Sequence, residues 1–274
     1  SRGLGDVYKR QNVFIKPIEN LSRTLVKHPF VPVSTKEFDS RAQEILNIQS
    51  TGLARRMISA HTEKLIIGLS GGLDSTLAFL VCLETLKSQA VEQKNLIAVT
   101  LPGPGTSEHT LQRDHELTES VDVKVREIKI HTAVEQHLRD IEHSGNTDTV
   151  FENAQARERT QVLFDLANQE AGIVVGTGDL SELALGWCTF NADQMSNYNV
   201  NVSVPKTMII YLVEWYAKHK ASKNLALALK RVIDTPISPE LIPPEQGEIQ
   251  QKTEEVIGHY ESVSYTHLTL PTKA

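Results

Sequence analysis

Residues 65–75 read LIIGLSGGLDS. The largely apolar run Leu65–Leu69 is typical of a strand that a parallel sheet buries on both faces. After it, Gly71 and Gly72 allow the backbone to turn tightly and to come close to a ligand. From Asp74 to Lys87, apolar side chains recur at helical spacing. The stretch therefore predicts a buried strand, a glycine turn and a helix in direct succession.

Strands and helices continue to alternate on both sides of this stretch. We predict further strands at residues 96–101, 123–130 and 173–175, and helices at residues 42–61, 107–120, 131–143, 152–169, 205–218 and 225–231. This alternation is typical of an α/β fold with a doubly wound parallel sheet flanked by helices. Ligands of such sheets gather at the carboxyl ends of the strands. The loops that begin at Ser70, Pro102 and Gly176 are therefore candidate binding loops.

Composition excludes several classes of protein. The chain has 274 residues, of which 40% are apolar, and a net charge of −6. This mildly acidic balance argues against binding of nucleic acid through bulk charge. No apolar run approaches the roughly 20 residues of a membrane helix, and no N-terminal stretch has the order of a secretion signal. Cys82 and Cys188 are too few and too far apart for a disulfide scaffold or a zinc site. We expect a cytoplasmic protein without nucleic-acid or membrane partners.

The glycine turn carries groups that suit the phosphates of a nucleotide. The start of a helix offers unpaired N–H groups and the positive end of a dipole. Ser70 and Ser75 add hydroxyl donors, and Asp74 can hold a Mg²⁺ ion that bridges phosphates. A plainer interpretation is an ordinary glycine turn in which Asp74 or Ser75 caps the helix. The stretch is not a Walker A motif, which needs a longer glycine loop that ends in lysine and serine or threonine.

Several blocks of the chain together indicate a family. SGGLDS at 70–75 resembles the pyrophosphate loop of the ATP pyrophosphatase superfamily. Five further blocks resemble the glutamine-dependent NAD synthetases of that superfamily: PGPGTS at 102–107, ENAQAR at 152–157, GTGDLSELALGWCTF at 176–190, YNVNVSVPKT at 198–207 and ISPEL at 237–241. The resemblance spans about residues 65–261. It implies a truncated synthetase domain with the adenine nucleotide alpha hydrolase-like fold.

The resemblance also implies roles for single residues. ATP contacts are expected at Gly68, Leu69, Ser70, Gly71, Gly72, Leu73, Asp74, Ser75, Thr177, Lys206 and Ser238. Contacts with deamido-NAD are expected at Asn153, Arg157, Glu182, Trp187, Cys188, Thr189 and Phe190. Asp74 and Glu182 are the expected Mg²⁺ ligands, and Asp74 and Lys206 the expected catalytic residues. ATP and Mg²⁺ are thus the implied cofactors.

Some of these residues also have a plainer explanation. Asp179 and Glu182 are three residues apart at a helix start, where they could form only a capping box. Trp187 could be ordinary core, and Arg157 could belong to a solvated helix face. Lys206 is harder to explain in this way because the dipole at a helix start disfavours a cation. We therefore expect Lys206 to have a phosphate or carboxylate partner.

Three positions depart from the pattern of the NAD synthetases. Phe190 stands where tyrosine is common, Asn197 where histidine is frequent, and His259 within a block that usually reads Gly-Pro-Tyr. We expect the first two to tune the packing of a ligand. The third lies near the end of the resemblance and is expected to be an error of sequence assembly.

The resemblance implies a two-step amidation. The nicotinate carboxylate of deamido-NAD attacks the α-phosphate of ATP, and pyrophosphate leaves into the Ser70–Ser75 loop. Ammonia then attacks the acyl-adenylate, which gives NAD and AMP. The segment before Ser70 is too short for the glutaminase domain of the glutamine-dependent relatives. Ammonia is therefore expected to be free or to come from a missing glutaminase, and the family implies a homo-oligomer.

The ends of the chain differ from the rest. Residues 1–10 and 264–274 show no period that continues into their neighbours, and they resemble translated adapter sequence. We expect a linker and leading helix at 11–60 and a C-terminally truncated synthetase domain at 61–263. Two other functions stay open at this point. One is a nucleotide-binding fragment without turnover, and the other is a different amidating or thiolating member of the superfamily.

Overall fold

Five short strands form one parallel sheet in the order β3-β2-β1-β4-β5. The computed structural model describes residues 28–32, 34–104 and 106–234. The strands are β1 (Leu65–Leu69), β2 (Leu96–Thr100), β3 (Val125–Glu127), β4 (Ile173–Gly176) and β5 (Tyr198–Asn199). Each neighbouring pair runs parallel. The predicted parallel sheet is confirmed.

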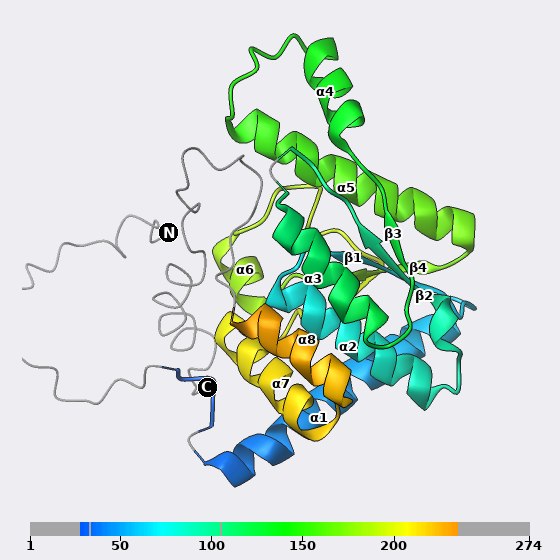
Figure 1. The fold of residues 1–274 in the computed structure, drawn as a ribbon, viewed down its shortest axis with the longest axis vertical. Helices are drawn as coiled ribbons and strands as arrows, with labels where there is room; N and C mark the ends of the chain where they lie inside the picture. The colour runs from blue at the N-terminus through cyan, green and yellow to red at the C-terminus, as the bar shows by residue number, and fades with distance from the viewer. Residues whose placement is uncertain (1–27, 33, 105, 235–274) are drawn as a thin grey trace, which may run out of the picture.

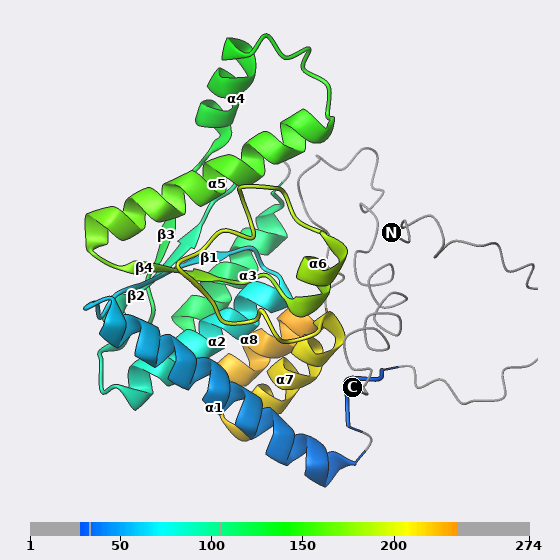
Figure 2. The ribbon, with the colours of Figure 1, turned by 180° about the vertical axis from the view of Figure 1, so that it is seen from behind.

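Helices cover both faces of this sheet. They are α1 (Thr35–Ser59), α2 (Leu73–Ser88), α3 (Glu108–Glu119), α4 (His131–Asp140), α5 (Thr149–Glu170), α6 (Leu180–Leu185), α7 (Lys206–His219) and α8 (Lys223–Ile233), with a short 3₁₀ turn, η2, at Gln93–Asn95. Figures 1 and 2 show α4 and α5 on one face, and α1, α2, α3, α7 and α8 on the other. The sheet is therefore doubly wound, as the sequence predicts.

The central strands send alternate side chains into two separate cores. In β1, Leu65, Ile67 and Leu69 pack with the helices α1, α2, α7 and α8, whereas Ile66 packs with α4 and α5. Side chains of β2 and β4 divide in the same way. Because both faces are covered, these strands are apolar throughout instead of alternating with polar residues. The apolar run at 65–69 is therefore a reliable strand signal.

The edge strands differ from the prediction. The strand predicted at 123–130 is ordered as a ladder only over Val125–Glu127, and its side chains are partly or fully exposed. Its partner β2 is followed by Pro102, which lacks an N–H and cannot continue the ladder. Beyond β3, only the Ile128 and Ile130 amides donate to Thr100 and Pro102 carbonyls. On the other edge, the two residues of β5 are too few to give a periodic signal.

Helix α1 begins earlier than predicted and belongs to the main core. Ser34 Oγ accepts from the Glu37 N–H over 3.3 Å and caps the helix, where the sequence predicts a start at residue 42. Ala42, Leu46 and Leu53 are buried in the same cluster as the side chains of α2. Helix α1 therefore packs against α2, the helix that follows the glycine loop.

Some predictions fall outside the described residues. They concern the ATP contact Ser238, the block at 237–241, His259, and the segments 1–10 and 264–274. Within residues 28–32, 34–104 and 106–234, every helix is too short or too polar to cross a bilayer.

Glu84 ties α2 to the end of α7. Its Oε1 accepts from the Tyr216 hydroxyl over 2.9 Å, and its Oε2 accepts from Lys220 Nζ over 2.6 Å. Burial alone would raise the pKa of Glu84, but the hydrogen bonds from Lys220 and Tyr216 outweigh it and hold this pKa below its usual range. The ionised carboxylate therefore stabilises the fold.

We expect Glu84→Gln to lower the free energy of unfolding by about 1–2 kcal/mol near neutral pH. Because the folded pKa lies below the unfolded value of about 4.3, this contribution is complete above that value and disappears as the pH falls through the folded pKa. Urea denaturation at about pH 7 and about pH 3 measures it. Glu92→Gln is the control, since its pair with Lys94 is 71% and 73% exposed. A difference that is the same at both pH values would contradict this account.

Candidate active site

The glycine loop between β1 and α2 is held in place by α3. Gly71 has a φ of +67°, in the left-handed region that favours glycine. A Cβ atom added there would lie 2.8 Å from Thr110 Cγ2. The Gly71 N–H donates to Asp114 Oδ1 over 2.9 Å, and Asp114 is only 1% exposed. The Gly71 amide is therefore turned toward α3 and fixes the shape of the loop.

The two serines of the loop bind one another. Ser75 Oγ accepts from the Ser70 N–H over 3.3 Å, donates to the Gly72 carbonyl over 3.1 Å and lies 3.2 Å from Ser70 Oγ. The N-cap of α2 is Gly72, and no side chain caps this helix. The plainer interpretation, a cap by Asp74 or Ser75, is therefore wrong. No described side chain serves as an acceptor for the first N–H groups of α2, at the carboxyl end of β1.

Lys206 joins the glycine loop to the loop that follows β4. Its Nζ lies 2.5 Å from Asp74 Oδ2, 3.0 Å from Asp179 Oδ2 and 3.0 Å from Glu182 Oε1. The lysine is 9% exposed, at the first position of α7. Pro205 is the N-cap, one position earlier than its predicted place in the first turn. The predicted anionic partner of Lys206 is confirmed, and it consists of three carboxylates from two other elements.

Asp179 and Glu182 do form the capping box that the sequence allows. Asp179 Oδ1 accepts from the Glu182 N–H over 2.8 Å, and Glu182 Oε2 accepts from the Asp179 N–H over 3.1 Å. The box uses one oxygen of each carboxylate, and the other oxygen of each faces Lys206. The two interpretations of this pair are therefore compatible, since each carboxylate caps the helix and also takes part in the charged cluster.

Burial and close contact shift the pKa values of the charged groups in this cluster. Burial raises the pKa of Asp179 and that of Glu182, although Lys206 opposes the rise. Burial would also lower the pKa of Lys206, but Asp74, Glu182 and Asp179 outweigh it and raise that pKa. Asp179 Oδ2 lies near Lys206 Nζ but outside hydrogen-bonding geometry, and the buried Asp74 Oδ1 has no hydrogen-bond donor among the described residues. One ammonium group thus faces three carboxylates.

Asp74, Asp179 and Glu182 fit a divalent cation that prefers oxygen ligands. One carboxylate oxygen from each of the three lies within 4.8 Å of the others. Mg²⁺ is usually bound by one or two carboxylates together with the phosphates of a substrate. Asp74 Oδ1 has no hydrogen-bond donor among the described residues, which fits its use as a ligand of such a cation. The sequence indicates Asp74 and Glu182 for this role, but Asp179 was recognised only as a helix cap.

A family model described as NAD synthase matches residues 45–265. This chain belongs to the NAD synthase family. The resemblance to the synthetase domain of glutamine-dependent NAD synthetases is thereby confirmed.

Curated members of the NAD synthase family are much longer than this chain. The glutamine-dependent NAD(+) synthetase of Mycobacterium leprae is 38% identical over 269 residues, which cover 94% of this chain and 40% of that protein. The corresponding protein of Mycobacterium tuberculosis is 40% identical over 243 residues, which cover 86% of this chain and 36% of that protein. This chain therefore spans less than half the length of the curated relatives that it matches.

A solved structure shows the fold of the family. The NMN synthetase of Francisella tularensis superimposes with a TM-score of 0.65 at 24% identity, and the match covers 85% of this chain and 88% of that one. Both have the adenine nucleotide alpha hydrolase-like fold that the resemblance implies.

The residues expected to contact deamido-NAD lie along α5 and the loop after α6. Thr189 Oγ1 donates to Asn153 Oδ1 over 3.0 Å, and Arg157 Nε donates to the Phe190 carbonyl over 3.4 Å. Trp187 is 45% exposed and Phe190 is 81% exposed. Trp187 is therefore not ordinary core. Arg157 is exposed on α5, as the solvated-face interpretation expects, and it also contacts the loop after α6. The structure thus joins Asn153 to Thr189 and Arg157 to Phe190.

Other predicted positions play a structural part in the NAD synthase fold. Leu69 and Leu73 are 5% and 4% exposed, so only their backbones can meet a nucleotide. Gly68 faces α5, where an added Cβ atom would lie 3.0 Å from Leu163 Cδ1. Asn197 Oδ1 accepts from the Val174 N–H over 2.7 Å, and its own N–H donates to the Val174 carbonyl, so the residue pairs with β4 just before β5. The expected effect of Asn197 on ligand packing stays a prediction.

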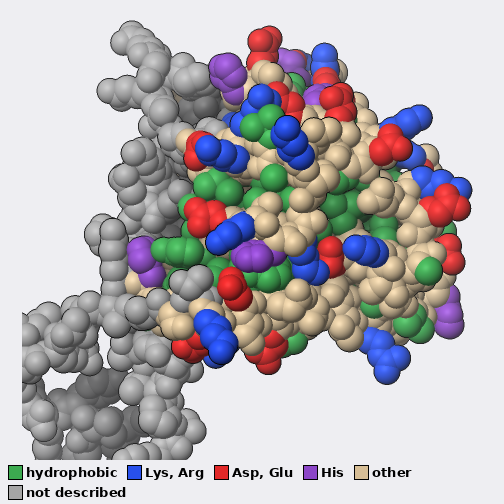
Figure 3. Space-filling view, turned by 60° about the horizontal axis from the view of Figure 1, so that its bottom comes forward, with side chains coloured by type: hydrophobic (Ala, Val, Ile, Leu, Met, Phe, Trp, Pro, Cys, Tyr) green, Lys and Arg blue, Asp and Glu red, His purple; other side chains and the backbone are tan. Residues whose placement is uncertain are grey.

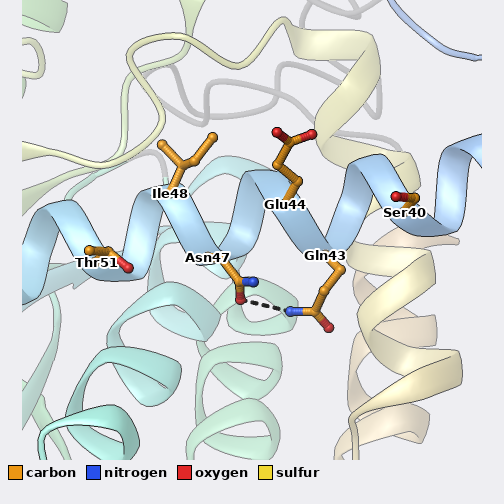
Figure 4. A pocket seen from close by; sticks show the side chains of 6 residues that line it. All are labelled: Ser40, Gln43, Glu44, Asn47, Ile48 and Thr51. Atoms are coloured by element: carbon orange, nitrogen blue, oxygen red, sulfur yellow. Dashed lines mark hydrogen bonds between the residues drawn. The ribbon is translucent and has the colours of Figure 1, made fainter.

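Surface hollows alone do not locate the site. One hollow of about 550 Å³ lies on the exposed side of α1, where Figure 4 shows the paired Gln43 and Asn47 beside Glu44 and Ile48. It contains none of the predicted site residues. A second, of about 380 Å³, lies between α4, α5 and the loop after α6, and Arg157 lines it. On the face drawn in Figure 3, described acidic and basic side chains are interspersed without a broad basic surface.

Proposed function

We propose that this chain catalyses the ATP-dependent amidation of deamido-NAD to NAD, with release of AMP and pyrophosphate. The observation that carries the proposal is the cluster in which Lys206 binds Asp74, Asp179 and Glu182 beside the glycine loop, in a member of the NAD synthase family. This cluster lies at the carboxyl ends of β1 and β4, where open α/β sheets bind ligands.

In the first step, a nicotinate carboxylate oxygen forms a bond to the α-phosphorus of ATP while the bond to the bridging oxygen of pyrophosphate breaks. Negative charge grows on the pyrophosphate. The first N–H groups of α2 and the Lys206 ammonium stabilise that charge. Mg²⁺, held by Asp74 and Glu182 with Asp179 as a further candidate, would neutralise phosphate charge.

In the second step, ammonia attacks the carbonyl carbon of the acyl-adenylate, the C–O bond to AMP breaks and a proton is lost to solvent. Neither step needs a side-chain nucleophile, so Cys188 contributes only as part of the substrate surface. The protein contributes position and charge. Thr177, beside the cluster, is the proposed further ATP contact, and Ser238 is proposed from the sequence alone.

Deamido-NAD is proposed to bind along α5 and the loop after α6. Asn153 accepts from the Thr189 hydroxyl, and Arg157 donates to the Phe190 backbone carbonyl. The exposed rings of Trp187 and Phe190 offer flat surfaces on which an aromatic base can stack. Glu182 contacts Lys206 and precedes this surface in the chain, and it is proposed to contact both substrates.

The wider setting forms part of the proposal. Ammonia is free or comes from a glutaminase region of the kind found in longer relatives, and the chain assembles as a homo-oligomer in the cytoplasm. Both cysteines are free thiols, in agreement with a reducing compartment. The domain limits at residues 11–60 and 61–263, and the foreign character of 1–10 and 264–274, also remain proposals.

The test follows NAD and AMP together after deamido-NAD, ATP, Mg²⁺ and ammonium are mixed with the protein. We expect equal amounts of both products and the loss of nearly all NAD formation in Asp74→Ala, because this change removes a phosphate-side carboxylate. Asp165→Ala is the matched control, since Asp165 is exposed on α5 and away from the cluster.

Other outcomes would reject the proposal in distinct ways. Binding of ATP that depends on Asp74 but gives no NAD would indicate a nucleotide-binding fragment without turnover. Amidation of nicotinate mononucleotide in preference to deamido-NAD would change the substrate and keep the chemistry.

A further inference from the structure

Asn201 connects the two loops that carry the charged cluster. It follows β5 and its side chain is fully buried. Its Nδ2 donates to the Asp74 carbonyl over 2.9 Å and to the Thr177 carbonyl over 3.0 Å. Asp74 lies in the first turn of α2, on one side of the site, and Thr177 directly follows β4, on the other side. One amide group therefore spans both sides.

The spacing of the two loops matters for the carboxylates that they hold. The Asp74 carboxylate belongs to the same residue as the first acceptor, and Asp179 is two positions after the second. A primary amide has two N–H groups at a fixed angle. With one group on each carbonyl, Asn201 fixes the separation of the two backbones at the base of the cluster. Removal of the amide would leave two partly buried carbonyls without this donor.

A second residue fixes the orientation of this amide. Gln49 of α1 is 6% exposed, and its Nε2 donates to Asn201 Oδ1 over 3.1 Å and to the Val200 carbonyl over 2.9 Å. Because Oδ1 is held by this donor, Nδ2 must face the two loop carbonyls. Asn199 adds another tie, since its Nδ2 donates to the Gly178 carbonyl over 2.8 Å and its Oδ1 accepts from the Asn201 N–H over 3.0 Å.

We propose that Asn201, oriented by Gln49, is a positioning residue that sets the distance between the Asp74 side and the Asp179–Glu182 side of the site. It touches neither substrate. Its effect is on how well the protein binds a magnesium–nucleotide complex. This inference rests on the proposed function because it takes the cluster to be the nucleotide site.

The experiment measures binding of a non-hydrolysable ATP analogue by calorimetry over a range of Mg²⁺ concentrations, together with thermal unfolding. In Asn201→Ala we expect about tenfold weaker nucleotide binding and an about tenfold higher Mg²⁺ concentration for half-saturation, from the loss of two partly buried hydrogen bonds. Gln49→Leu keeps the Asn201 side chain but removes the donor that orients its amide. We therefore expect smaller shifts in nucleotide affinity and in the Mg²⁺ concentration for half-saturation, in the same direction as in Asn201→Ala. This second variant carries the test if Asn201→Ala does not fold.

Thr85→Val is the matched control for stability. Thr85 is fully buried in α2, and its hydroxyl donates to the Val81 carbonyl over 2.7 Å and to the Ser50 carbonyl of α1 over 3.3 Å. The substitution removes a buried donor between α1 and α2, far along α2 from Asp74. We expect a lower unfolding temperature with unchanged nucleotide and Mg²⁺ affinities.

The possible results separate this inference from the proposed function. If Asn201→Ala lowers stability as Thr85→Val does and leaves both affinities unchanged, Asn201 is only a structural residue and the inference is wrong. A wild-type protein that binds the magnesium–nucleotide complex but does not amidate deamido-NAD rejects the proposed function and leaves the positioning test valid. A wild-type protein that binds no nucleotide overturns both.

Discussion

Replacement of Lys206 by methionine should lower kcat for NAD formation by about a hundred- to a thousandfold. Methionine keeps the length and the apolar stem of the side chain but removes the ammonium group. That group lies within 3.0 Å of carboxylate oxygens from Asp74, Asp179 and Glu182. Without it, phosphate charge that grows during attack on ATP loses a positive partner inside a site with little water, where such a partner has its largest effect.

The same variant should change the response of the fold to Mg²⁺. Three clustered carboxylates without a counter-ion, one buried and two partly buried, repel one another, so Lys206→Met should unfold at a lower temperature than the wild type in the absence of Mg²⁺. Added Mg²⁺ should raise the unfolding temperature more in the variant than in the wild type, because it binds the native cluster. Lys230→Met, at an exposed position of α8, is the control. An equal Mg²⁺ response and an unchanged kcat would contradict the role of Lys206.

The parts of the fold that the sequence predicts well are those whose causes are local. β1 and β2 are predicted within a residue because burial on both faces makes them apolar without interruption. Strand β3 is predicted too long and β5 is not predicted, since the extent of an edge strand depends on where its neighbouring strand stops. The start of α1 at Thr35 is missed because its apolar period is strong only from Ala42 onward.

The contacts of the site likewise divide into those with a local cause, which the sequence predicts, and those between distant segments, which it does not. The anionic partner of Lys206 follows from the unfavourable placement of a cation at a helix start, which is a local argument. Gln49 and Asn201 are 152 residues apart in the chain, and no periodic pattern links them. Asp114, which holds the Gly71 amide, is likewise indistinguishable in the sequence from a surface acid of α3. Polar contacts between distant segments become visible only in the folded chain.

Asp179 shows how a sufficient explanation can hide a second role. The spacing of Asp179 and Glu182 is fully explained by a capping box, and the structure contains that box. Nothing in the sequence indicates that Asp179 Oδ2 lies 3.0 Å from Lys206 Nζ. The two oxygens of one carboxylate therefore have different partners, and substitutions can separate them.

Asp179→Asn should lower kcat by about a hundredfold while it leaves α6 capped. Asparagine keeps an oxygen that can accept from the Glu182 N–H, as Asp179 Oδ1 does over 2.8 Å, but it replaces the charged Oδ2 with an amide that cannot bind Lys206 or a cation. Asp179→Ala loses the cap as well, so it should lose the same activity and about 1 kcal/mol more stability. Thermal unfolding and steady-state kinetics on the two variants distinguish the roles. Full activity in Asp179→Asn with loss only in Asp179→Ala would mean that Asp179 acts through the cap alone, because only the cap differs between these variants.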